Sequence, residues 1–189
     1  DSLKAFDVYE RIPADQTEEI RSDPDAIIVG SRWVRILKAD GRTKARLVAQ
    51  QINTGGKMDT YAATASGAGA RVLLALAAQR RRRGEAWCLQ TGDVSTAFLH
   101  APLPPDRHFY ITPPSTEREG DALWKLKRAL YGLRESPRFF QEHLAHVASA
   151  HGWQRLRADP QLFYHQESNS LLSVFADDLL MLVRTRDVK

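Results

Sequence analysis

Two adjacent aspartates interrupt an apolar run near the end of the chain. Asp177 and Asp178 separate residues 171–175 from residues 179–184, and each flank has the length and composition of a short strand. The pair is therefore expected at the turn of a β-hairpin. Neighbouring carboxylates in apolar surroundings repel each other and each carries a desolvation cost, which a hard divalent cation such as Mg²⁺ would offset. As plain turn residues, the same aspartates would need no cation.

A third aspartate ends another predicted strand. Residues 86–93 have strand composition and finish in Asp93, far from the hairpin in the sequence. Only the fold could bring the three carboxylates together. A strand-end acid and a carboxylate hairpin are what a two-metal phosphoryl-transfer site requires. Asp93, Asp177 and Asp178 are therefore the catalytic and metal-binding candidates, and we expect them to converge.

The remaining pattern mixes short strands with two main helices. Helices are predicted over residues 70–83, with Val72, Leu73, Leu76 and Ala77 on one apolar stripe, and over residues 136–152. Further strands are predicted at residues 32–38, 43–50, 107–112, 122–127 and 161–165. Asp40-Gly41 predicts a type I′ turn between the first two of these. This order of elements predicts an α+β fold.

Composition adds weaker constraints. The chain has 189 residues and a net charge of +4, a mild basic excess that suits a polyanionic partner. Its one cysteine, Cys88, excludes an internal disulfide and a cysteine-based zinc cluster, and fits a reduced intracellular setting. No apolar stretch reaches the length of a membrane span, so no membrane partner is expected.

Four blocks of the sequence carry a family resemblance. They read DVSTAFLH at 93–100, FADD at 175–178, LYGLRESP at 130–137 and KARLVA at 44–49. In their order along the chain, these blocks resemble those of reverse transcriptases of the Ty1/copia retrotransposon class, over about residues 27–183. The resemblance implies that Asp177 is the stronger ligand beside Asp93 and that Asp178 supports it.

The resemblance also implies an architecture. We expect a reverse-transcriptase palm, a ferredoxin-like antiparallel sheet with helices on one face, together with fingers. The fingers would be residues 27–68 and 101–135, and an incomplete palm residues 69–100 and 136–189. Residues 1–26 are expected to be an irregular lead-in, and the thumb and ribonuclease H domains to be absent from this fragment.

The implied function is RNA-directed DNA polymerisation, a nucleotidyl transfer that uses two Mg²⁺ or Mn²⁺ ions. Its partners would be an RNA template, a DNA or RNA primer, dNTPs, and the rest of a Pol polyprotein with its integrase and ribonuclease H. The setting would be intracellular, in cytoplasmic virus-like particles, with the nucleus as the alternative. The competing hypothesis is a decayed or repurposed fragment that binds RNA or DNA without catalysis.

Five further residues are substrate-binding candidates by resemblance. Phe98 would lie under the incoming sugar and exclude a 2′-hydroxyl, or be a core aromatic. Lys44 and Arg46 would give at least one cation to the triphosphate, or be solvated strand charges. Tyr131 would stack on a base or pack, and Gly132 would shape a template-facing loop.

Two other features concern the placement of positive charge. Gln50-Gln51 stands where the family commonly has a basic residue followed by glycine, which removes a cation from the fingers. The run Arg80–Arg83 could form a nucleic-acid patch, but basic residues at a helix end complement the helix dipole and stay in water. We favour the second interpretation.

Overall fold

The computed structural model describes residues 2–52, 61–63 and 67–187. It divides the chain into two compact units, each built from two separate stretches. Unit 1 is Asp1–Thr60 with Phe98–Phe140, and unit 2 is Tyr61–Ala97 with Gln141–Lys189. Each unit contains a five-stranded sheet and helical segments, which confirms the α+β class. The predicted boundaries between fingers and palm fall after residues 68, 100 and 135.

Unit 1 is a mixed sheet with the strand order β1-β6-β5-β2-β3. Strands β2 and β5 are parallel, and the other neighbours are antiparallel. Its elements are α1 (Ser2–Ala5), β1 (Tyr9–Ile12), the 3₁₀ helix η1 (Ala14–Gln16), α2 (Thr17–Ser22), β2 (Ala26–Leu37), β3 (Thr43–Gln50), β5 (His108–Ile111) and β6 (Leu123–Leu126). The short helix α4 (Ala97–His100) and the helix α5 (Ser136–Ala150) span the boundaries between the units.

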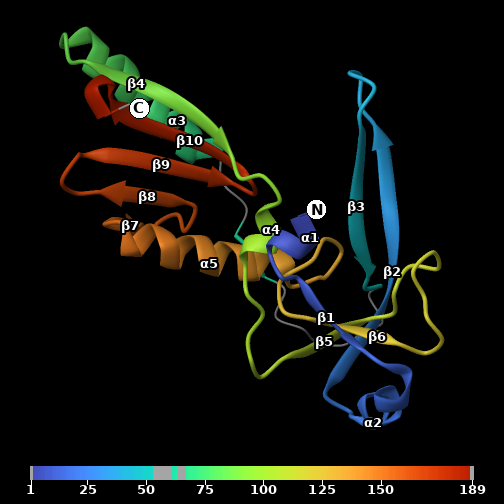
Figure 1. The fold of residues 1–189 in the computed structure, drawn as a ribbon. Coiled ribbons are helices and arrows are strands. Elements are labelled where there is room, and N and C mark those ends of the chain that lie inside the picture. The colour runs from blue at the N-terminus through green and yellow to red at the C-terminus, as the bar shows by residue number, and fades with distance from the viewer. Residues whose placement is uncertain (1, 53–60, 64–66, 188–189) are drawn as a thin grey trace. The chain divides into compact units, whose positions relative to one another are not determined.

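The prediction that residues 1–26 form an irregular lead-in is wrong. Residues 9–12 form β1, which pairs with β6 at the edge of the unit 1 sheet (Figure 1). Val8 is fully buried, and the ring of Tyr9 stacks on Trp124 with centroids 4.0 Å apart. The acidic composition misled the prediction, because these few apolar side chains hold the segment while its charges stay in water.

The β2–β3 hairpin turns where it was predicted, but not by a type I′ turn. The N–H of Gly41 donates to the carbonyl oxygen of Lys38, and the N–H of Lys38 donates to that of Arg42. Gly41 has φ +79°, whereas Asp40 is not among the residues with positive φ. A three-residue loop with a left-handed glycine at its last position has this pattern.

Unit 2 is an antiparallel sheet with the strand order β4-β10-β9-β8-β7 (Figure 1). Its elements are α3 (Gly67–Arg82), β4 (Trp87–Asp93), β7 (Trp153–Arg155), β8 (Leu162–His165), β9 (Ser170–Phe175), β10 (Asp178–Arg184) and the 3₁₀ helix η2 (Thr185–Asp187). Every neighbouring pair among these strands is antiparallel. The expected antiparallel sheet is therefore observed, whereas its ferredoxin-like arrangement stays a prediction.

The two helices of unit 2 pack on opposite faces of this sheet, which corrects the expectation of helices on one face. Leu73 of α3 packs with Leu182 and Leu180, whereas Ala148 of α5 packs with a cluster that Leu179 joins. Successive side chains of a strand point to opposite faces, so the two clusters lie on the two sides of β10.

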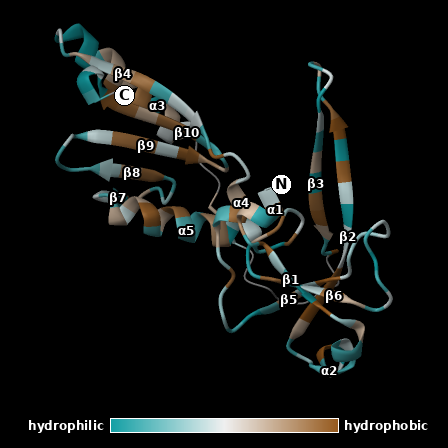
Figure 2. Ribbon diagram, in the orientation of Figure 1, coloured by the Kyte–Doolittle hydropathy of each residue, from teal (hydrophilic) through white to brown (hydrophobic). Residues whose placement is uncertain are grey.

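The structure buries only part of the predicted apolar stripe of α3. Leu73 is buried and Leu76 and Ala77 pack beside it, but Val72 is 46% exposed. The C-terminal end of α3 is hydrophilic (Figure 2). Within the part of the chain that the structure describes, no helix has both the length and the apolar character needed to cross a membrane.

Candidate active site

The adjacent aspartates lie at a hairpin tip, as predicted. Phe175 of β9 pairs with Asp178 of β10, which leaves Ala176 and Asp177 as the two turn residues. Ala176 has φ +54°. Asp177 is not among the residues with positive φ, and positive φ at the first turn residue alone is the geometry of a type II′ turn, where glycine is usual. This turn therefore holds a strained alanine beside the acidic residues.

The sheet register brings Asp93 opposite Asp178. These residues are the last partners of the β4–β10 pair, and the N–H of Val94 donates to the carbonyl oxygen of Asp177 at 2.8 Å. Directly opposite residues on antiparallel strands point to the same face. Asp93 and Asp178 therefore share a face of the sheet, and Asp177 lies next to them in the turn.

All three aspartates are exposed to solvent. The expectation that they carry a desolvation cost is therefore wrong, because the turn projects beyond the apolar clusters of the sheet. Ser95 Oγ donates to Asp93 Oδ2 at 3.4 Å.

The donor set fits a hard divalent cation chemically. Two like charges directly opposite each other on neighbouring strands are unfavourable unless something neutralises them, and carboxylate oxygens are the ligands that Mg²⁺ takes. Among the described residues, however, no group of three or more His, Cys, Asp or Glu side chains is placed to hold a metal ion. The convergence of all three aspartates on one cation stays a prediction.

A pocket of about 300 Å³ adjoins the hairpin tip. Gly67 and Ala70 of α3 line it together with Thr91, Phe175 and Asp178. Phe175, the last residue of β9, is 56% exposed. A space lined by one carboxylate and mostly apolar atoms can hold an uncharged ring or sugar beside the acidic pair.

Three substrate-binding candidates form one cluster inside unit 1. The guanidinium of Arg46 lies over the Tyr131 ring, 5.2 Å from its centroid. Phe98 meets the same ring edge to face, with centroids 4.9 Å apart, and also contacts Phe140 at 6.2 Å. Tyr131 and Phe98 therefore both pack, and Arg46 is held by an aromatic face. Lys44, two residues along the same strand, is exposed.

Gly132 occupies a position that no other residue could take without strain. Its φ is +86°, and a Cβ added there would collide with the carbonyl oxygen of Ala49. This close approach comes from backbone pairing, because the N–H of Ala49 donates to the carbonyl oxygen of Tyr131 at 2.7 Å and Val48 forms a bridge with Tyr131. Gly132 thus lets the loop dock against β3.

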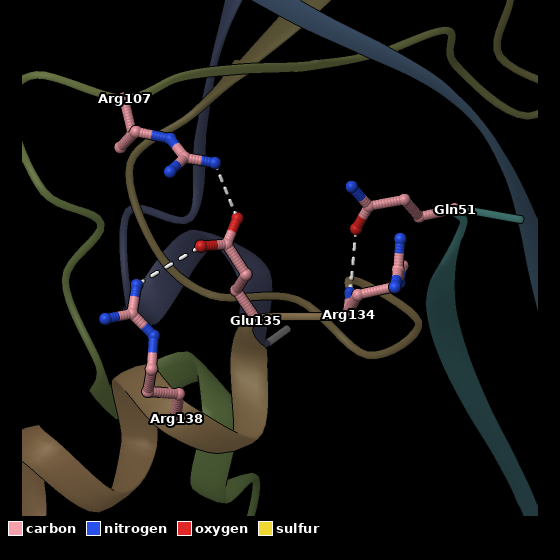
Figure 3. A network of polar contacts seen from close by, with 5 residues as sticks. All are labelled: Gln51, Arg107, Arg134, Glu135 and Arg138. Carbon is pink, nitrogen blue, oxygen red and sulfur yellow. Dashed lines mark hydrogen bonds and ion pairs between the residues drawn. The ribbon is translucent and has the colours of Figure 1, made fainter. Parts of the chain in front are cut away.

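A buried polar network behind this loop was missed at the sequence level. Figure 3 shows Glu135 between Arg107 and Arg138. Glu135 is fully buried, and its two carboxylate oxygens accept from Arg107 at 2.7 Å and from Arg138 at 3.2 Å. Two guanidinium partners satisfy a buried carboxylate that would otherwise be very costly. A Glu beside the Ser-Pro helix start was the only available signal.

Gln51 has a structural role that the lost-cation interpretation did not foresee. Its side-chain oxygen accepts the backbone N–H of Arg134 at 2.7 Å (Figure 3). The residue that departs from the family pattern therefore ties the end of β3 to the same loop. Glycine, the residue that the family commonly has at this position, has no side chain to accept this hydrogen bond.

The candidates fall into two groups. Asp93, Asp177 and Asp178 belong to unit 2, whereas Phe98, Lys44, Arg46, Tyr131 and Gly132 belong to unit 1. The expectation that Phe98 lies under the sugar of an incoming nucleotide concerns both units and stays a prediction.

Comparison with known proteins gives a consistent result. A family model described as reverse transcriptase (RNA-dependent DNA polymerase) matches residues 17–189. The chain is 30% identical over 169 residues to the retrovirus-related Pol polyprotein from transposon RE2 of Arabidopsis thaliana, covering 84% of this chain and 11% of the relative.

Other relatives are of the same kind. The Pol polyprotein from transposon RE1 of Arabidopsis thaliana is 31% identical over 82% of this chain and 11% of the relative. The one from transposon TNT 1-94 of Nicotiana tabacum is 27% identical over 80% of this chain and 12% of the relative. The chain thus spans about a tenth of the length of these polyproteins.

Proposed function

The chain belongs to the reverse transcriptase (RNA-dependent DNA polymerase) family, in its copia-type branch, and from this premise we propose that it carries the nucleotidyl-transfer centre of an RNA-directed DNA polymerase. The observation that supports this most is the register that sets Asp93 opposite Asp178, with Asp177 in the adjoining turn. In this proposal unit 2 is the palm and unit 1 the fingers.

The aspartates would hold two divalent cations, Mg²⁺ or Mn²⁺. Bound there, such ions supply activation of a primer 3′-hydroxyl and charge stabilisation at the transferring phosphate. The chain's own contribution is to hold the carboxylates by strand pairing, so that little reorganisation is needed when the substrate arrives. The exposure of the three side chains leaves them accessible to a nucleotide.

The unit 1 cluster would act on the nucleotide. Phe98 would exclude a 2′-hydroxyl, and Arg46 and Lys44 would contact the triphosphate. Arg46 is held over Tyr131, so it is the more ordered of the two cations. Gly132 would keep the loop that bears Tyr131 against β3.

The partners in this proposal are an RNA template, a DNA or RNA primer, dNTPs and the rest of a Pol polyprotein with its integrase and ribonuclease H. The cytoplasm, inside virus-like particles, is the proposed place of synthesis, with the nucleus as the alternative.

The second candidate function is nucleic-acid binding without catalysis. One observation favours it: no group of three metal-ligating side chains is preassembled among the described residues. The two functions differ in their need for the aspartates.

The deciding experiment is primer extension on an RNA template with Mg²⁺ or Mn²⁺, using a version of the protein extended through the downstream region of its gene. Asp93→Asn and Asp178→Asn should each abolish extension, whereas Asp106→Asn, at an exposed aspartate of unit 1, should not. Retention of template binding without extension by the unaltered protein would favour the second function.

A further inference from the structure

A basic pocket lies at the end of the unit 2 sheet that is remote from the aspartates. Its volume is about 460 Å³, and its lining includes Arg80, Glu85, Trp87, Asn169, Arg184 and Arg186. Trp87 begins β4 and Arg184 ends β10, whereas Asp93 and Asp178 stand at the other ends of these strands. Six residue steps at about 3.3 Å each separate the two places by about 20 Å.

Arg80 is firmly held in this pocket. Its guanidinium carbon lies 3.6 Å from the centroid of the Trp87 ring, and both terminal nitrogens donate to the carbonyl oxygen of Asn169 at 3.3 Å. Asn169 is itself fixed, because its Oδ1 accepts the hydroxyl of Tyr164 at 2.6 Å. An ordered guanidinium loses less side-chain entropy when it binds a ligand.

A second guanidinium approaches the same ring. Arg184 lies 5.5 Å from the Trp87 centroid, and the indole N–H of Trp87 donates to Glu85 at 3.1 Å. Burial lowers the pKa of the Arg80 guanidinium, Glu85 and Tyr164 raise it, and the positive charge of Arg184 lowers it again. Arg184 thus repels Arg80, and Glu85 offsets that repulsion in part, so the lining combines three guanidinium groups with one carboxylate.

We propose that this pocket binds phosphate groups. Guanidinium forks match phosphate oxygens in geometry and charge, and here Arg80 and Arg184 meet at one aromatic ring while Arg186 adds a third positive charge. Arg81 and Arg82 differ from Arg80, since they are exposed and need no explanation beyond the helix end.

The phosphate would come from a nucleic-acid strand or from a free polyphosphate. Either source is separate from the aspartate site, so the proposal goes beyond the polymerase function and is tested by binding alone.

The test is fluorescence anisotropy of a labelled single-stranded RNA over a range of salt concentrations. The variant carrying both Arg80→Gln and Arg184→Gln should bind roughly 10-fold more weakly and show a shallower salt dependence, as expected when phosphate contacts are removed. The matched control is the variant carrying Arg81→Gln and Arg82→Gln. It loses the same charge at two exposed residues of α3 and should change the affinity less than about 2-fold. Equal weakening by both pairs would overturn the proposal.

Two additions keep the result interpretable. Arg186 is exposed and is not stacked on Trp87, so Arg186→Gln should leave the fold intact. It should weaken RNA binding, and it therefore tests the pocket if the double variant unfolds. The binding assay contains no divalent cation, so it does not depend on metal binding by the aspartates, which separates this proposal from the polymerase function.

Inorganic tripolyphosphate identifies the source of the phosphate. If free polyphosphate is the ligand, calorimetric titration should detect tripolyphosphate binding, and its affinity should fall when Arg80 and Arg184 are replaced. If replacement of these arginines weakens only the binding of RNA, the pocket binds a nucleic-acid strand. Absence of a dependence on these arginines with both probes would exclude a phosphate site.

Discussion

Single residues decide whether the loop at 130–135 can dock on β3. Gly132 combines a left-handed backbone with contact against the carbonyl oxygen of Ala49, and Glu135 places a charge where no solvent reaches it. Neither is a catalytic candidate, but both fix the position of Tyr131. The cluster around Tyr131 in unit 1 therefore depends on the close backbone approach at Gly132 and on the buried contacts of Glu135.

Gly132→Ala is expected to destabilise the protein by more than about 2 kcal/mol. The positive φ alone costs roughly 1 kcal/mol, and the backbone collision adds to it. Urea unfolding followed by tryptophan fluorescence measures the loss. Gly120→Ala is the matched control, because Gly120 has φ +56° but open space around its Cβ position, and should cost only about 1 kcal/mol. Equal losses at both sites would contradict the close docking.

Glu135→Gln is expected to cost about 3–5 kcal/mol, because it leaves Arg107 and Arg138 without their buried countercharge. The same unfolding experiment measures it. The control is Glu119→Gln, whose pairing with Arg11 at 3.8 Å is exposed and should matter by less than about 1 kcal/mol. Little change in the free energy of unfolding of Glu135→Gln would mean that Glu135 does not form these two buried ion pairs.

Phe98→Ala is expected to raise ribonucleotide incorporation in a complete enzyme built on this sequence, because the bulky ring would no longer exclude the 2′-hydroxyl. Phe98 also contacts Tyr131 and Phe140, so the variant will lose stability as well. The ratio of ribonucleotide to deoxynucleotide incorporation, measured on folded protein, separates the two effects. An unchanged ratio would leave Phe98 a packing role only.

At the scale of elements, the sequence predicted where strands and turns lie better than it predicted the turn type and the packing of helices on the sheet. The β9–β10 hairpin, the strand ending in Asp93 and the helix beginning at Ser136 all follow from local pattern. The type of the turn at Gly41 did not, because Asp-Gly suits more than one hairpin geometry. The face that each helix covers depends on packing between distant segments, which a single sequence does not specify.

The β2–β3 hairpin tip should respond to pH. The side chain of Arg42 and then its backbone N–H hold the pKa of Asp40 below its ordinary value. A lowered pKa means that the contribution to hairpin stability is complete above the ordinary pKa and is lost as the pH falls through the folded one. NMR titration of the Asp40 carboxyl should show this, and Arg42→Gln should return its pKa toward the ordinary range. An identical titration in both proteins would show that the contact is absent in solution.

At the scale of the whole molecule, the assignment of stretches of the chain to fingers and palm came from family order rather than from composition, and it stays a prediction. Residues 1–26 show the limit of composition as a guide, since Val8 and Tyr9 attach a largely charged segment to the sheet. The candidate aspartates were identified from local sequence, but their pairing required the strand register. That Asp178 rather than Asp177 faces Asp93 depends on the turn at Ala176, which no periodicity revealed.

The 189-residue chain alone is expected to bind nucleic acid weakly and to extend primers poorly or not at all. Its net charge of +4 offers few phosphate contacts, and non-specific affinities of this kind are roughly 10⁻⁴–10⁻⁶ M at physiological salt. Fingers and palm, to which its two units are assigned, would hold the primer duplex by few contacts, so a bound primer end would leave before many additions.

The aspartate pair should nonetheless bind divalent cations, because strand pairing inside unit 2 positions it. Mn²⁺ binding followed by electron paramagnetic resonance should therefore be measurable in the chain alone and be lost in Asp93→Asn. Primer extension on an RNA template, with Mg²⁺ or Mn²⁺, should be processive only in a version extended through the downstream region of the gene. Processive synthesis by the 189 residues alone would show that fingers and palm suffice to retain the primer.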